Sequence, residues 1–254
     1  MEGKKVYFAS DFHLGLSAGT NPHYREARVV AWLRKAAEDA SEIYLLGDIF
    51  DFWWEYRDVV PRGFTRFLGT LSAITDSGIK VHVFTGNHDL WMKEYLAEEC
   101  GVVIHHGPLL TEIGGKRFYL AHGEGLGSLS RGFKFLLGFF HNRFAQWFFT
   151  FLHPRIGMTI GHKWSNSSRL AKHVSLPFLG EEKEDLIRHT RQLISDGCDA
   201  VYFIYGHRHM PMTRDEKGRR MIILGDWFSF TSYAVYDGSE LRLISEPYSA
   251  LTLA

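Results

Sequence analysis

Short apolar segments alternate with helical patterns along the first hundred residues of the chain. Three such segments, at 5–10, 42–46 and 80–85, have the length and the β-branched or aromatic content of buried strands. Apolar residues at helical spacing predict helices over 24–40 and 62–77 between them. Strands that alternate with helices build βαβ units, so we expect a largely parallel sheet here.

After Gly101 the pattern changes to one typical of antiparallel strands. The Gly114-Gly115 pair separates two apolar runs and predicts a hairpin. The expected elements of this half are a charged helix at 181–196 and strands at 102–106, 109–113, 117–121, 200–205, 220–224, 232–236 and 241–245. No linker, repeat or low-complexity segment interrupts the chain. We therefore expect a mixed α/β fold in a single domain over residues 1–254.

Composition places the chain among ordinary globular proteins, with 45% hydrophobic and 23% charged residues. Because 29 basic and 29 acidic residues cancel, no overall field attracts nucleic acid, and we expect no nucleic-acid partner. Cys100 and Cys198 are far apart, which favours free thiols in a reducing compartment. The first strand follows no signal-peptide pattern, and no apolar run reaches about 18 residues. We expect a cytoplasmic protein without a membrane span.

Side chains that suit metal ions follow five of the expected strands. They are Asp11 with His13, Asp48, Asn87, His122, and His207 with His209. Ligands of α/β sheets bind at the carboxyl ends of strands. The two pairs have i, i+2 spacing, so in an extended segment both members face the same way. Two carboxylates, four imidazoles and one amide exceed the needs of one tetrahedral ion and suit two ions that share a carboxylate.

Each of these motifs alone also has an ordinary structural explanation. Residues 47–48 and 86–89 are compatible with turns or helix caps, and 207–209 with a solvated basic turn. The recurrence of ligand types directly after buried strands favours a metal site over these alternatives. Nitrogen and oxygen donors without thiolate predict two divalent ions and suit Mn²⁺, Fe or Zn²⁺ better than Cu(I) or an iron–sulfur cluster. Residues 90–96 resume a helical pattern.

Taken together, the motifs resemble those of the calcineurin-like metallophosphoesterase family. They are Asp11-x-His13, Gly47-Asp48, Gly86-Asn87-His88-Asp89, His122 and Gly206-His207-x-His209. The resemblance implies a hydrolase with a four-layer α/β/β/α sandwich and a dinuclear metal site. It implies one ion on Asp11, His13, Asp48 and His209, and another on Asp48, Asn87, His122 and His207. It also implies that metal-activated water attacks the phosphorus atom. His88 would stabilise charge on the transferring phosphoryl group, and Asp89 would orient His88.

Within that family, the chain is most similar to the UDP-2,3-diacylglucosamine pyrophosphohydrolases of lipid A synthesis. The similarity lies in residues 8–15 and 45–53 and in a helical insertion, the lid, expected at 125–176. It implies hydrolysis of the pyrophosphate bond of UDP-2,3-diacylglucosamine to UMP and 2,3-diacylglucosamine 1-phosphate. Position 88 departs from this subfamily, where we expect Arg, and matches the broader family, which has His. Two alternative functions remain open. One is a phosphodiesterase or phosphatase that acts on a soluble nucleotide or phosphoprotein, and the other is an inactive metal-binding scaffold.

The insertion is rich in aromatic residues. One helical stripe contains Phe133, Leu136, Leu137, Phe140, Phe144, Trp147, Phe148 and Phe151, while Phe135, Phe139 and Phe149 lie outside it. A surface helix needs only one apolar stripe. We interpret the segment either as a core or dimer helix or as a lid that forms an acyl-chain chamber and touches the membrane. Basic residues in and after it favour anionic headgroups. We therefore expect peripheral contact with the inner leaflet of the cytoplasmic membrane, and no obligate protein partner.

Candidate substrate contacts lie in and around the insertion. They are Glu124, Arg131, Asn166, Ser167, Arg169 and Lys172. The last four belong to a segment that, in the lipid A hydrolases, reaches the glucosamine and the phosphates. A helix cap followed by a solvated helix face is the alternative interpretation of that segment.

Overall fold

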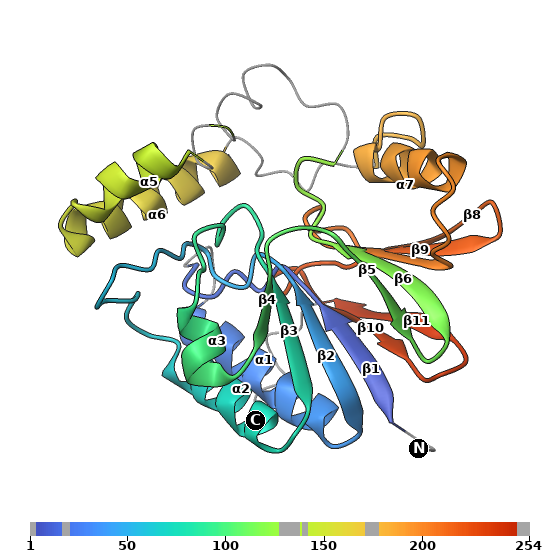
Figure 1. Cartoon of the computed structure of the whole chain (residues 1–254), viewed down its shortest axis with the longest axis horizontal. Coiled ribbons are helices and arrows are strands. Elements are labelled where there is room, and N and C mark those ends of the chain that lie inside the picture. The colour runs from blue at the N-terminus through green and yellow to red at the C-terminus, as the bar shows by residue number, and fades with distance from the viewer. Residues whose placement is uncertain (1–3, 17–20, 127–137, 139–141, 171–177, 248–254) are drawn as a thin grey trace.

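Two stacked β-sheets lie between helices and give the protein four layers (Figure 1). The computed structural model describes residues 4–16, 21–126, 138, 142–170 and 178–247. One sheet has six strands in the order β11-β10-β1-β2-β3-β4, and the other has five in the order β5-β6-β7-β9-β8. The α/β/β/α sandwich implied by the family resemblance is therefore confirmed.

The six-stranded sheet contains the predicted parallel core. Its strands are β1 (Lys5–Ala9), β2 (Ala40–Leu46), β3 (Lys80–Phe84), β4 (Val103–His105), β10 (Phe230–Tyr236) and β11 (Leu241–Pro247). The first four are mutually parallel. Strand β10 pairs antiparallel with β1, and β11 pairs antiparallel with β10 at the edge of the sheet. Its outer face is covered by α1 (Pro22–Ala37), α2 (Thr65–Asp76) and α3 (Tyr95–Cys100). Leu33 of α1 and Phe67 of α2 are fully buried in this layer.

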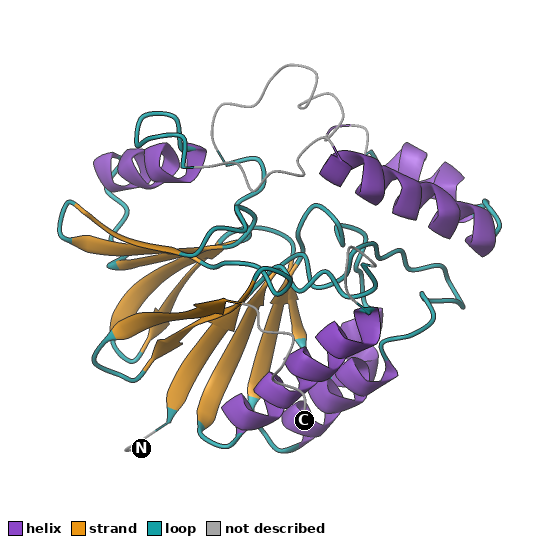
Figure 2. Cartoon of the chain, turned by 180° about the vertical axis from the view of Figure 1, so that it is seen from behind, coloured by secondary structure: helices purple, strands orange, loops and turns teal. Residues whose placement is uncertain are grey.

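The five-stranded sheet packs on the other face of the first. Its strands are β5 (Leu109–Ile113), β6 (Lys116–Ala121), β7 (Tyr202–Tyr205), β8 (Met212–Glu216) and β9 (Arg219–Ile223), and α7 (Asp185–Ser195) covers its outer side. Between the sheets, the rings of Phe8 and Phe118 stack with centroids 5.8 Å apart. Strands β6, β7 and β9 are parallel to one another. Both sheets therefore direct the ends of parallel strands toward one group of loops (Figure 2).

Two helices, α5 (Arg143–Thr150) and α6 (Pro154–Leu170), stand apart from the other helices above those loops (Figure 1). Phe149 of α5 packs on Trp54, with ring centroids 4.3 Å apart. The stripe residues Phe144, Trp147, Phe148 and Phe151 are 55–77% exposed. The alternative of a core helix is therefore wrong for the described part of the insertion, because the stripe faces outward and Phe149 faces inward. Phe133 to Phe140 of the predicted stripe lie outside the described residues.

Two other local predictions differ from the structure. Residues 90–94 are not helical, and α3 begins only at Tyr95. A β-bridge pairs Trp91 with Trp54, and the Glu55 carboxylate accepts hydrogen bonds from the backbone N–H groups of Glu94 and Tyr95. These tertiary contacts override the local helical pattern. Strand β8 was not predicted, because its charged sequence forms an edge strand with little apolar signal.

Within the described residues, none of the helices has the length and hydrophobicity needed to span a membrane.

Candidate metal centre

The predicted ligands come from loops that follow β1, β2, β3, β6 and β7. Six of them form two clusters of three whose ligand atoms lie within 4.8 Å of one another. The first cluster contains Asp11, His13 and His209, and the second contains Asp48, His122 and His207. Asn87, the seventh, lies directly after Gly86, whose backbone approaches the Asp48 carboxylate. The sequence prediction thus named residues that the fold brings together from five strand ends.

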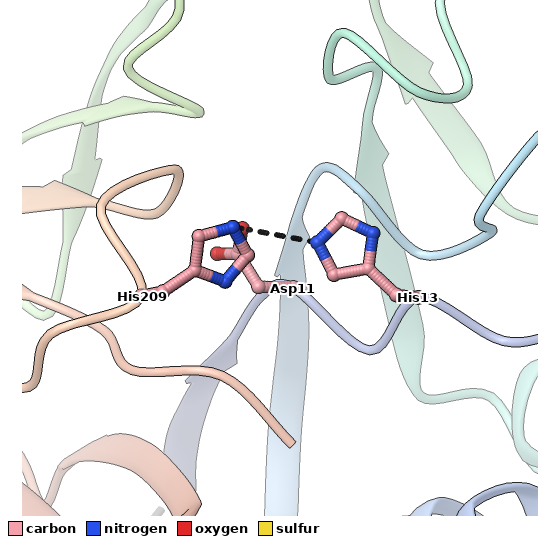
Figure 3. A group of neighbouring side chains, drawn as sticks. All are labelled: Asp11, His13 and His209. Carbon is pink, nitrogen blue, oxygen red and sulfur yellow. Dashed lines mark ion pairs between the residues drawn. The ribbon is translucent and has the colours of Figure 1, made fainter. Parts of the chain in front are cut away.

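The first cluster centres on the carboxylate of Asp11. Figure 3 shows this carboxylate converging with the rings of His13 and His209. Asp11 Oδ1 lies 3.8 Å from His13 Nε2 and 3.7 Å from His209 Nε2. The other oxygen, Oδ2, accepts hydrogen bonds from Ser10 Oγ at 2.5 Å and from His207 N–H at 3.0 Å. One oxygen is therefore fixed by the protein while the other faces the imidazoles.

Asp48 lies between the two clusters. Its Oδ2 is 3.4 Å from His122 Nε2 in the second cluster and 3.7 Å from His13 Nε2 in the first. Its Oδ1 accepts a hydrogen bond of 2.9 Å from the His88 N–H. This is the position that a carboxylate shared by two ions requires, and it agrees with the bridging role that the family resemblance implies.

Several buried polar atoms at this centre make no hydrogen bond. They include Asp11 Oδ1, Asn87 Oδ1 and His122 Nε2. Such atoms are costly to bury unless a ligand engages them. The opposite ring nitrogen of His122 lies 2.8 Å from the Leu46 carbonyl oxygen, which turns Nε2 toward Asp48. Carboxylate, amide and imidazole donors arranged in this way fit divalent metal ions.

Burial and mutual charge shift the pKa values at the centre strongly. Burial opposes ionisation of Asp48, yet His122 and His88 hold the pKa of its carboxyl well below the usual range. Burial likewise opposes protonation of His122, but Asp48 raises the pKa of His122 to about 10. For Asp11, burial dominates and raises the pKa to about 6. Without metal, protons on the imidazoles balance the carboxylates, and divalent ions would replace those protons.

Five of the ligands have a left-handed backbone conformation. Their φ values are +56° for Asp11, +44° for His13, +52° for Asp48, +67° for His207 and +53° for His209. Only two other non-glycine residues among those described have positive φ outside the centre, Phe64 and Lys217. Such conformations cost free energy and concentrate at functional sites. The expectation that each pair lies in extended chain is therefore wrong, and His207 and His209 contribute to different clusters.

Glycines next to the ligands allow backbone and carboxylates to approach closely. A Cβ atom at Gly206 would lie 2.7 Å from Asp11 Oδ2 and from Ser10 Oγ, and one at Gly86 would collide with Asp48 Oδ1. Any side chain at these two positions would displace a ligand. The glycines of the Gly86-Asn87 and Gly206-His207 motifs are thus part of the construction of the centre.

His88 lies beside the clusters and is held by residues that the sequence did not single out. Its Nδ1 is 2.9 Å from the Asp51 carbonyl oxygen and 3.2 Å from Ser165 Oγ in α6. Ligand-type atoms of His13, Asp51 and His88 also lie within 4.8 Å of one another. Asp51 and Ser165 have no local signal in the sequence, because they become neighbours only when α6 packs over the loop after β2.

Asp89 has a different environment from the one expected of a residue that orients the phosphoryl-binding group directly. Its oxygens accept hydrogen bonds from the N–H groups of Ile49, Phe50 and Gly86 at 2.7–3.2 Å. Burial and the charge of Asp48 raise the pKa of Asp89 to about 7. Asp89 therefore ties the loop after β2 to the loop after β3.

Two further residues support the histidine ligands from outside. Buried Asp226, three residues after the end of β9, has Oδ2 3.6 Å from His209 Nδ1. Arg208 donates two hydrogen bonds, of 2.9 and 2.7 Å, to the buried carboxylate of Glu184 and so anchors the loop between His207 and His209. Asp226 carries the same signal as the predicted ligands, an acidic residue at a strand end. Glu184 carries none, because its partner is distant in sequence.

The predicted substrate contacts are only partly placed. Glu124 is half-buried just after His122 and lines a small pocket beside the second cluster. Asn166, Ser167 and Arg169 lie in the last turns of α6, and their side chains are outside the description. Arg131 and Lys172 lie outside the described residues. These assignments stay predictions.

Comparison with known protein families matches residues 4–211 to the family described as calcineurin-like phosphoesterase. The chain belongs to the calcineurin-like phosphoesterases. Members of this family are hydrolases that use divalent metal ions, and the two clusters supply this phosphoesterase with residues that can hold them.

Among characterised relatives, the phosphoesterase is similar to the UDP-2,3-diacylglucosamine hydrolase of Porphyromonas gingivalis. The two are 39% identical over 95% of this chain and 97% of the relative. It is also 27% identical to the enzyme of the same name from Aeromonas hydrophila, over 93% of this chain and 96% of that one. Among solved structures it is similar to an archaeal phosphodiesterase, with a TM-score of 0.46 and 14% identity over 95% of this chain and 99% of that chain.

Proposed function

We propose that this phosphoesterase hydrolyses the pyrophosphate bond of UDP-2,3-diacylglucosamine to UMP and 2,3-diacylglucosamine 1-phosphate. The main support is the 39% identity to a hydrolase named for that substrate over nearly the whole of both chains. The geometry of the metal centre supports the same reaction, since Asp48 lies between two clusters that together suit an in-line displacement at phosphorus.

In this proposal the ligands divide as the two clusters do. One ion is held by Asp11, His13, Asp48 and His209, and the other by Asp48, Asn87, His122 and His207. When bound, two divalent ions supply positive charge for the phosphoryl oxygens and lower the pKa of water. The resemblance to the lipid A hydrolases supports Mn²⁺ as the ion used, and the donor set without thiolate also suits Fe or Zn²⁺.

His88 is proposed to bind a phosphoryl oxygen as negative charge develops there. The contacts of Nδ1 to the Asp51 carbonyl and to Ser165 Oγ fix the orientation of the ring beside the metal centre. Histidine changes its protonation near neutral pH, whereas arginine does not. With water attacking the α-phosphorus, the bond to the bridging oxygen breaks and the sugar 1-phosphate leaves. His88 can therefore also deliver a proton to that leaving sugar 1-phosphate, a role that Arg at this position does not allow.

The insertion over residues 125–176 is proposed to act as a lid over the lipid part of the substrate. Phe149, Trp54 and Trp91 form an apolar cluster on the inner side of α5. On the outer side, exposed Trp147 and Phe148 suit insertion into a bilayer surface. Exposed Arg155 and Lys163 of α6 add positive charge that suits anionic headgroups. We propose peripheral contact with the cytoplasmic membrane by this surface.

The deciding experiment incubates the Mn²⁺-loaded protein with UDP-diacylglucosamine and, separately, with soluble phosphodiesters and phosphomonoesters. We expect UMP to be released from the lipid substrate at a rate at least about a hundredfold above any soluble compound, because only the lipid engages the lid. Turnover restricted to the soluble compounds would replace this proposal with the soluble-substrate alternative. No turnover of any compound by protein that binds Mn²⁺ would favour the inactive scaffold.

A further inference from the structure

A pocket of about 150 Å³ opens beside the second metal cluster. Its walls come from the ends of β3, β4 and β6, and His122 and Gly86 belong both to the pocket and to the metal centre. Pockets for whole drug-sized ligands measure about 300–1,000 Å³. This one therefore suits a single ring attached to something that continues outside it.

The pocket lies away from the contacts made by the lid helices. Described residues of α5 and α6 reach the loops at Asp51, Trp54, His88 and Trp91. None of the described residues of α5 or α6 lines the pocket. Leu90 lies at the border between the two regions, because it lines the pocket and also packs against the apolar cluster of Trp54 and Trp91 under the lid. A substrate whose phosphates rest on the metal centre can therefore extend in two directions, under the lid and into the pocket.

The lining of the pocket combines flat apolar walls with polar groups. Leu90, Pro108 and Leu126 supply apolar surface. Thr85 supplies a hydroxyl, His106 an exposed imidazole and Glu124 a half-buried carboxylate. The edge of a uracil ring presents an N–H group between two carbonyl oxygens. A carboxylate accepts from that N–H, and a hydroxyl or imidazole donates to the carbonyls.

We infer that this pocket binds the uracil of the substrate, with Glu124 accepting the ring N–H and Thr85 and His106 donating to the carbonyl oxygens. This inference rests on the proposed function, since it assigns the nucleotide end of that substrate. Cytosine has no N–H at the corresponding ring position, so Glu124 selects uracil over cytosine. The nucleotide and the acyl chains then leave the metal centre in two directions, with Leu90 between them.

The test measures inhibition of the Mn²⁺-loaded enzyme by UMP, CMP and ribose 5-phosphate, with the lipid substrate and with a small phosphodiester that lacks a base. We expect UMP to inhibit about tenfold more strongly than CMP or ribose 5-phosphate. In Glu124→Gln this preference falls to within about twofold. In His106→Ala, inhibition by UMP weakens about tenfold, because one hydrogen bond to the base is lost, whereas inhibition by ribose 5-phosphate, which has no base, changes by less than about twofold.

Matched controls are Glu112→Gln in β5 and His23→Ala in α1, which lie outside the pocket and leave the preference intact. If the lipid is turned over but UMP, CMP and ribose 5-phosphate inhibit equally, the uracil pocket is wrong and the proposed function stands. If the lipid is not turned over but UMP is still preferred and Glu124→Gln removes that preference, the pocket stands and the lipid substrate is wrong. Equal effects of Glu112→Gln and Glu124→Gln would also overturn the pocket.

Discussion

Ser165 Oγ donates a hydrogen bond of 2.9 Å to Asp51 Oδ1, although 114 residues separate the two in sequence. Both side chains are buried. The same hydroxyl is 3.2 Å from Nδ1 of His88. Helix α6 and His88 are thus joined by one side chain, so the position of the helix and the orientation of the His88 ring depend on each other.

Replacing Ser165 by Ala should lower kcat about tenfold. The hydroxyl holds the His88 ring, and a net hydrogen bond is worth about 1–1.5 kcal/mol, which corresponds to about one order of magnitude in rate. Steady-state kinetics on the lipid substrate measure the effect. Ser165→Thr, which keeps the hydroxyl, should restore most of kcat. Thr159→Ala in the same helix is the control, because Thr159 bonds only to the exposed backbone of its own helix at Arg155. An equal loss in Thr159→Ala would mean that Ser165 affects helix stability alone.

Asp48→Asn should reduce turnover by a factor on the order of 10³, because the shared negative charge of the centre is lost. Its side chain keeps nearly the same size, so the fold should persist. The metal content of the purified variant, measured by inductively coupled plasma mass spectrometry, should fall below that of the parent protein. Activity within a factor of ten of the parent would rule out Asp48 as the bridge. Asp58→Asn, at an exposed position, serves as the matched control.

Removal of metal should lower the melting temperature by about 5–10 °C. A ligand present at about a hundred times its Kd stabilises the folded state by about 2.7 kcal/mol, and each kcal/mol shifts Tm by about 2–4 °C in a chain of this size. The buried, unbonded oxygens of Asp11 and Asn87 are the groups that lose their partner. The melting temperature is measured by thermal unfolding with chelator and, as the control, with chelator presaturated with Mn²⁺. Identical Tm values under both conditions would contradict metal binding at the centre.

His82 should make the protein less stable in mild acid. Its ring stacks on Tyr44 with centroids 4.4 Å apart, and its Nδ1 is 2.9 Å from His105 Nε2. Burial, and then the charge of His105, lower the pKa of His82 from 6.5 to about 4. Between these two values the unfolded chain binds a proton that the folded protein excludes. The free energy of unfolding therefore falls as the pH decreases through this window, by roughly 2–3 kcal/mol for this residue.

His82→Phe keeps the ring and removes the titration, so urea unfolding should show a flatter dependence on pH across the same window. His23→Gln, at an exposed position in α1 away from this cluster, is the control and should keep the slope of the parent protein. A slope unchanged in His82→Phe would assign the acid sensitivity to other groups, of which His105 is the nearest, since burial also lowers its pKa.

The double variant Trp147→Ser with Phe148→Ser should bind vesicles that contain anionic lipid about a hundredfold more weakly. Both side chains are more than half exposed, and burying each in the interface is worth about 1.5–3 kcal/mol. Cosedimentation with vesicles measures the binding. The pair Val59→Ser and Leu110→Ser removes exposed apolar surface elsewhere and should leave binding unchanged. Equal binding by the lid variant and the parent would place the membrane contact on another surface.

Most of the fold and the metal ligands were predictable because they depend on local pattern. Strand ends followed by Asp, Asn or His mark the centre wherever the preceding strand is buried, as at Asp48 and His122. The two-sheet arrangement came from the family resemblance and not from the periodicity. Ser165 and Glu184 were not predictable, since their importance arises from partners that lie 114 and 24 residues away. The outward orientation of the aromatic stripe was not predictable either, because periodicity shows that a face exists and not what covers it.

The backbone is left-handed at Asp11, His13, Asp48, His207 and His209. This conformation restricts which ligand residues can stand at these positions, and therefore which metal ions this fold can bind. Aspartate, asparagine and histidine are the non-glycine residues that occupy such conformations most readily. A cysteine introduced at one of these positions to favour a softer ion, or a glutamate introduced to alter the coordination, would meet a backbone conformation that is less favourable for it as well as a changed donor. The loops therefore select the chemical type of the ligand before any ion binds. Redesigning the metal preference of this protein would require new loops and not only new side chains.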